Sequence, residues 1–293
     1  MRWKKYGIEM DMTGITRKAV AEILAEQFDT KVVFCLSDNG YNVPDQNQRL
    51  WRILSSDSIK AEKYNGEKVV GANYMYQVKL LSPFLYENEF PMLEKALEQL
   101  ELRGAIVNDS TKMNLLLDVS CIENWEKYQT NLENLYESKG ELFQKALDIP
   151  FSQVADTSQG KENGVISFPY FKSTLNKKEL LSDIQFAQIV SSFAENNRTV
   201  SQKKSENQND KFMMRTWLVR AGMVGEEYKF ARKMLTKNLE GNSAWQKMME
   251  PAEIQTEPTE IESKEVCNQA QSEEEMMDNP VEEQVVSDLE LEV

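Results

Sequence analysis

The chain has 293 residues and no histidine, and its net charge of −14 lies almost wholly in residues 251–293, which hold 14 acidic residues and one basic residue. The first 250 residues, with 34 acidic and 33 basic residues, offer phosphate no excess of cations, so binding to nucleic acid is disfavoured. No stretch approaches the roughly 20 apolar residues of a membrane helix, and three scattered cysteines fit neither a zinc site nor a disulfide framework, so we expect a cytoplasmic protein.

The first 103 residues predict short strands and two helices. Alternation predicts a strand over 6–12, and Thr16 is a plausible N-cap for a helix that ends near Phe28. Its apolar residues recur at i, i+3 and i+4, the spacing of one helix face. Further along the chain, the sequence predicts strands at 32–35, 51–54 and 74–81 and a helix from Pro91 to Arg103.

The remaining residues predict longer helices around two more strands. A strand-like run occupies 104–118, and helical spacing follows over 124–147 with a break near Gly140. A polar loop at 156–163 leads to a strand around 165–171 and a helix over about 178–196. After a polar linker at 201–210, we expect two helices within 212–245, separated near Gly222.

The acidic segment 250–293 is predicted to be a disordered tail, because its composition buries too little apolar surface to offset the entropy of ordering. We favour the interpretation that it is a solvating tail. The alternative is a docking segment, in which Val285, Val286, Leu289 and Leu291 beside acidic residues bind a basic, apolar groove on a protein partner.

Several stretches together resemble one family, the amidoligases, which are ATP-dependent carboxylate–amine ligases related to glutamine synthetase and glutamate–cysteine ligase. Residues 6–17 resemble the family opening G-I-E-x-E-M-T-G-I-T-R, and residues 104–118 resemble G-A-x-V-N-x-S-C-G-x-H-x-H-V-D. Tyr41, Val43, Asp45, Arg49 and Trp51 match a Y-x-V-x-D…R-x-W run. The segments 212–222 and 238–245 are similar to two later family motifs.

The resemblance implies an α+β fold with a curved, largely antiparallel sheet of glutamine-synthetase-like type and packed helices. We expect an amidoligase-like core over residues 1–175, a helical C-terminal module over 176–249 that completes the same body, and the acidic tail over 250–293. Arg215 and Arg220 in the module are either solvated residues of a helix packed by Trp217 and Leu218, which we favour, or contacts for an anion or partner.

The chain departs from the family pattern where the resemblance implies chemistry. Lys79 stands at a family glutamate, and Asn114 and Leu116 stand at two histidines that alternation places on one face of a strand. Ser167 replaces a glutamate and Pro169 an arginine. A ligase needs magnesium held by carboxylates and oxygen ligands, and cations at the transferring phosphoryl group. The protein is therefore identified as a degenerate member of the family.

Glu9 and Asp11 remain as an acidic pair on one face of the first predicted strand and are the candidate metal ligands. Their environment has two interpretations. In the one we favour, Lys79 fills the space of the lost metal and neutralises both carboxylates, because an internal ion pair relieves much of the cost of burying them. In the other, a weak magnesium site persists.

Three functional hypotheses follow from these residues. The first is a pseudoenzyme that acts as a binding or regulatory module, with no cofactor. The second is an active, divergent ligase that uses Mg-ATP and in which Glu9, Asp11, Asp57 and Asp118 serve as rearranged ligands. The third is a structural partner of an intact paralogue or of another enzyme, with the acidic tail as the possible contact. No contact with nucleic acid or membrane is expected in any of them.

Overall fold

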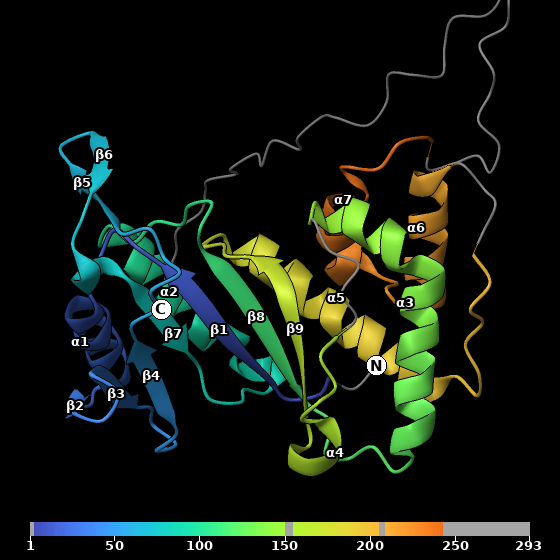
Figure 1. Cartoon of the computed structure of the whole chain (residues 1–293), viewed down its shortest axis with the longest axis horizontal. Coiled ribbons are helices and arrows are strands. Elements are labelled where there is room, and N and C mark those ends of the chain that lie inside the picture. The colour runs from blue at the N-terminus through green and yellow to red at the C-terminus, as the bar shows by residue number, and fades with distance from the viewer. Residues whose placement is uncertain (1–2, 150–154, 205–208, 243–293) are drawn as a thin grey trace, which may run out of the picture. The chain divides into compact units, whose positions relative to one another are not determined.

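A mixed α+β body with a mostly antiparallel, curved sheet is present, which confirms the predicted fold class (Figure 1). The computed structural model describes residues 3–149, 155–204 and 209–242, and these belong to one compact unit that spans residues 1–249. Within them, the main sheet has the order β2-β3-β4-β7-β1-β8-β9, and each neighbouring pair is antiparallel. The predicted acidic tail and Trp245 lie outside the described residues.

The strands of the main sheet are short, and β1 lies next to its centre. Their bounds are β1 Tyr6–Met12, β2 Val33–Cys35, β3 Gly40–Pro44, β4 Leu50–Leu54, β7 Val78–Leu81, β8 Lys112–Asp118 and β9 Val165–Lys172. A separate hairpin, β5 Glu62–Asn65 and β6 Lys68–Gly71, projects away from this sheet (Figure 1).

Alternation along β1 separates the two faces of the sheet. Tyr6, Ile8 and Met10 are fully buried and point to the face that packs against the helices. Glu9 and Asp11 point to the opposite face. The apolar side chains of the first face join those of the helices in one continuous core. This core fixes the register, because a slip by one residue would expose the apolar face.

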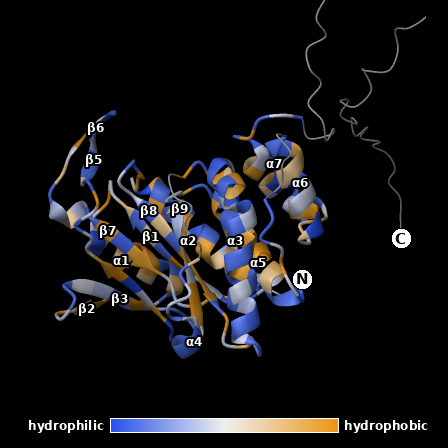
Figure 2. Ribbon diagram, turned by 45° about the vertical axis from the view of Figure 1, so that its right-hand side comes forward, coloured by the Kyte–Doolittle hydropathy of each residue, from blue (hydrophilic) through white to orange (hydrophobic). Residues whose placement is uncertain are grey.

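Of the α-helices that the structure describes, all but the single turn at Gly160–Asn163 form close to where the sequence predicts them. The Thr16 hydroxyl accepts a hydrogen bond from the Ala19 N–H and caps α1. The bounds are α1 Arg17–Phe28, α2 Phe90–Leu102, α3 Trp125–Leu147, α4 Gly160–Asn163, α5 Lys177–Asn196, α6 Asp210–Arg220 and α7 Lys229–Thr236. Hydrophilic and hydrophobic residues follow each other along α3, as expected for a helix with one buried side (Figure 2). In α6, Trp217 and Leu218 are buried, as the packing interpretation of this helix predicts.

Three local predictions were wrong. Only the second half of the expected strand 74–81 is a strand, since the Asn73 side chain accepts from the Met75 N–H and caps a 3₁₀ turn at Tyr74–Tyr76. Helix α3 continues through Gly140, because its buried stripe extends on both sides of that residue. The expected loop 156–163 contains the one-turn helix α4.

Two features were missed. Strand β3 carries the family run at Tyr41 and Val43 but was not predicted as a strand. The hairpin β5–β6 turns at Gly66, which has a φ of 65° and opens a two-residue loop, the conformation in which glycine is favoured.

No helix among residues 3–149, 155–204 and 209–242 is long and apolar enough to cross a membrane.

Candidate functional site

The strand register brings the substituted positions together on the face of the sheet that points away from the helices. Asp11 is paired with Lys79 of β7, and Glu9 is paired with Asn114 of β8. On the other side of β8, Leu116 is paired with Ser167 of β9. We call this set the polar face: it consists of Glu9, Asp11, Lys79, Asn114, Leu116 and Ser167, together with Pro169, the exposed residue two positions after Ser167 on β9.

Lys79 and Asp11 form an ion pair on the β7 side of the polar face. The Lys79 Nζ lies 3.1 Å from the Asp11 Oδ1, and the side chains are 31% and 3% exposed. The other carboxylate oxygen of Asp11 accepts a long hydrogen bond of 3.4 Å from the Lys112 N–H. The sequence interpretation has Lys79 neutralise both retained carboxylates, and the structure pairs it with Asp11, the more deeply buried of the two.

Glu9 has a different neighbour from the one expected. Asn114 donates a hydrogen bond of 3.1 Å from Nδ2 to the Glu9 Oε2, so that the amide, and not Lys79, contacts this carboxylate. The Asn114 Oδ1 is buried and has no hydrogen-bond partner among the described residues. Asn114 occupies the position of a histidine in the family pattern, and there its side-chain amide donates a hydrogen bond to Glu9.

The remaining substituted positions line the β9 side of the polar face. Leu116 offers no ligand atom and lies between Gly7 of β1 and Ser167. The backbone of Ser167 exchanges two hydrogen bonds with Asp156, of 3.0 and 2.8 Å. Pro169 is exposed, near the irregularity between β8 and β9, a place that tolerates a residue with no N–H.

The four carboxylates of the divergent-ligase hypothesis are not gathered at one place. Asp57 is exposed in the turn after β4. Asp118 lies at the end of β8, with one carboxylate oxygen 3.7 Å from the Lys5 Nζ. Across the residues that the structure describes, no three acidic, histidine or cysteine side chains are arranged so as to hold a metal ion.

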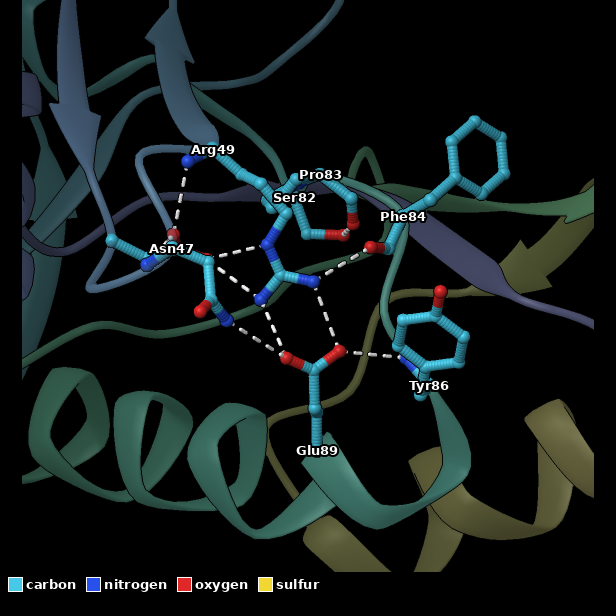
Figure 3. Close-up of polar contacts among 8 residues, drawn as sticks. Asn47, Arg49, Ser82, Pro83, Phe84, Tyr86 and Glu89 are labelled. Atoms are coloured by element: carbon cyan, nitrogen blue, oxygen red, sulfur yellow. Dashed lines mark hydrogen bonds and ion pairs between the residues drawn. The ribbon is translucent and has the colours of Figure 1, made fainter.

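A second charged cluster joins the β3–β4 turn, the segment after β7 and the start of α2 (Figure 3). The Arg49 guanidinium donates to both Glu89 oxygens, at 2.9 and 2.7 Å, and to the Phe84 carbonyl, at 3.0 Å. Its Nε donates to the Asp45 Oδ2 at 2.9 Å. Asp45 is buried, and its other oxygen accepts from the backbone N–H groups of Asn47 and Arg49. Arg49 therefore holds the β3–β4 turn against the start of α2.

The same cluster lowers the pKa of one of its carboxyl groups. Hydrogen bonds from Arg49 hold the pKa of the Glu89 carboxyl below its usual value. Sequence reasoning matched Asp45 and Arg49 to the family but missed Glu89. One local feature of the sequence could have indicated Glu89. It lies three residues after Tyr86 and accepts a hydrogen bond from the Tyr86 N–H, as the glutamate of a capping box does.

Arg17 was matched only as part of the family opening, and it has a structural role. Its Nη1 donates to the Ser55 hydroxyl and to the carbonyl oxygens of Tyr74 and Gln77, at 3.0, 2.8 and 3.2 Å. The guanidinium also lies over the Tyr74 ring, 5.6 Å from its centroid. Arg17 thus ties α1 to the segment that leads into β7. Like Arg49, it matches the family pattern and holds elements together.

The comparison with protein families supports the family resemblance seen in the sequence. A family model described as "Putative amidoligase enzyme" matches residues 2–154, which is more than half of the chain. The match includes β1, β7 and β8 and hence Glu9, Asp11, Lys79, Asn114 and Leu116; Ser167 and Pro169 lie beyond it. No curated protein and no solved structure matches the chain. The chain belongs to the amidoligase family.

Proposed function

We propose that this protein is a pseudoenzyme of the amidoligase family, which keeps the ligase scaffold and acts as a binding or regulatory module. The observation that carries the proposal is the ion pair between Lys79 and Asp11 at 3.1 Å, with Asn114 donating to Glu9 beside it. Both retained carboxylates are therefore engaged by side chains that stand at ligand positions of the family pattern.

The charge on the polar face supports this proposal physically. A divalent cation at Asp11 would lie within a few ångströms of the Lys79 ammonium, and like charges at that distance repel by several kcal/mol at an effective dielectric constant of about 20. Leu116 and Pro169 bring no ligand atom, and Asn114 already donates to Glu9. The residues present do not fit a magnesium–nucleotide site, and we derive no catalytic step through one.

The proposed role requires a protein partner, either an intact paralogue or an unrelated enzyme, and the acidic tail at 250–293 is the sequence feature that would serve docking. We also propose that the body consists of a core over residues 1–175 and a helical module over residues 176–249. We propose a cytoplasmic location, which suits the free thiols of Cys35 and Cys121. Purification of the tagged protein from its native host would identify a stable partner.

The first test is thermal unfolding with and without Mg·ATP. A ligand at about 100 times its Kd stabilises a protein by roughly 2.7 kcal/mol, which raises the midpoint of a body of this size by several degrees. We expect no shift with Mg·ATP, with ADP or with magnesium alone. A magnesium-dependent shift together with ATP turnover on adding a carboxylic acid and an amine would instead establish the divergent ligase.

A second test asks whether Lys79 itself opposes the metal. The variant K79E restores a carboxylate beside Asp11, so we expect Mg²⁺ or Mn²⁺ to raise its unfolding midpoint where the wild type shows no response. K79M is the matched control, since it removes the ammonium without adding a ligand. If all three proteins responded equally to the metal, Lys79 would not be the residue that excludes it.

A further inference from the structure

Helix α7 presents a basic and apolar surface that the polar face does not involve. Two lysines of the helix, Lys229 and Lys233, and its C-cap residue Lys237 recur at i, i+4 and i+8 and are all exposed, so they form one row. Phe230 beside this row is 43% exposed, and Val224 in the preceding turn is 58% exposed. We call these five residues the α7 surface.

The opposite side of α7 is firmly packed, so the α7 surface is a fixed feature of the body. Ala231 and Leu235 are buried in the core. Arg232 donates to the carbonyl oxygens of Met223 and Gly225, both at 2.9 Å, and ties the helix to the preceding turn. The helix therefore has a defined orientation, with the lysine row pointing outward.

The α7 surface has a small excess of positive charge. Residues 226–240 contain four basic residues and three acidic ones, Glu226, Glu227 and Glu240. Glu226 lies 3.3 Å from the Lys229 Nζ. Lys178 from α5 adds another cation, with its Nζ 5.9 Å from the centroid of the Phe230 ring. Lysines at i and i+4 repel each other by a few tenths of a kcal/mol.

We propose that the α7 surface is a docking site for an acidic, apolar segment of a partner protein. Carboxylates of that segment would pair with the lysine row, and aliphatic side chains would cover Phe230 and Val224. The charge complementarity selects an acidic occupant, and the exposed ring selects one that also has apolar residues. With Lys178 the surface offers four lysines, the lower end of the roughly four to eight basic residues in clusters that recognise anionic lipid headgroups, so lipid vesicles are the competing ligand in the test.

The test uses the full chain and a labelled amphipathic peptide built from glutamate and leucine. Fluorescence anisotropy is measured at about 0.05 M and about 0.3 M salt, since screening weakens contacts between exposed charges. We expect binding to the wild type that falls with salt. The triple variant K229E/K233E/K237E should bind about tenfold or more weakly, and F230S several-fold more weakly. The same peptide with lysine in place of glutamate should not bind.

A charge-matched control separates this surface from net charge. The variant K18E/K68E/K95E changes three exposed lysines on α1, β6 and α2 by the same total charge and should bind the acidic peptide like the wild type. Circular dichroism checks that every variant is folded. Equal binding by the two triple variants, or no binding by the wild type, would overturn the proposal. Binding to phosphatidylserine vesicles that depends on the α7 lysines, without peptide binding, would overturn it in favour of a membrane surface.

Discussion

The ion pair between Lys79 and Asp11 makes a quantitative prediction for stability. Lys79→Met removes the ammonium and keeps an unbranched side chain. At 3.1 Å, two unit charges attract by about 5 kcal/mol at an effective dielectric constant of about 20, and desolvation offsets much of this. Breaking a buried pair costs about 3–5 kcal/mol and an exposed one about 0.2–1 kcal/mol. Because Asp11 is buried and Lys79 is partly exposed, we expect K79M to lose about 1–3 kcal/mol.

The assay is urea unfolding followed by tryptophan fluorescence, in a double-mutant cycle with Asp11→Asn. The asparagine keeps the shape of the aspartate and removes its charge, so K79M should cost little in the D11N background. The two changes should therefore couple by about 1 kcal/mol or more. If K79M costs as much in D11N as in the wild type, the stabilisation does not come from the ion pair and the electrostatic reasoning is wrong.

Two further predictions concern the scaffold. Arg49→Met should lower the free energy of unfolding in urea by about 3 kcal/mol. The folded-state pKa of Glu89 lies below its unfolded value near 4.5, so the stability that the ionised Glu89 contributes is full above that pH and is lost as pH falls through the folded pKa. R49M lacks this contribution and should therefore lose less stability than the wild type between pH 7 and 3. Gly14→Ala should cost about 2 kcal/mol or more in thermal unfolding, because a Cβ there would lie 2.2 Å from the Gly104 carbonyl oxygen at a φ of +83°. Gly71→Ala is the control and should leave stability nearly unchanged, because the space around Gly71 is open. The assignment of Arg49 would be refuted if R49M and the wild type lost the same stability on acidification, and that of Gly14 if the two glycine variants lost the same stability.

Much of the fold could be predicted from local patterns. Alternation over residues 6–12 predicted β1 and placed Glu9 and Asp11 on one face, and the cap at Thr16 predicted the start of α1. Local patterns failed where a single side chain redirected the chain, as Asn73 does at the 3₁₀ turn. They failed again at Gly140, where packing outweighed the low helix propensity of glycine.

The composition of the polar face was determined by the sequence itself: the absence of histidine, the lysine at position 79 and the leucine at position 116 are evident without any coordinates. Which of these side chains meet was decided by the tertiary structure. Glu9 and Asn114 are 105 residues apart, and Arg49 and Glu89 are 40 residues apart. Their contacts depend on the order β7-β1-β8 and on the docking of α2, which arise from burying one common core and are not encoded in the periodicity of any single segment.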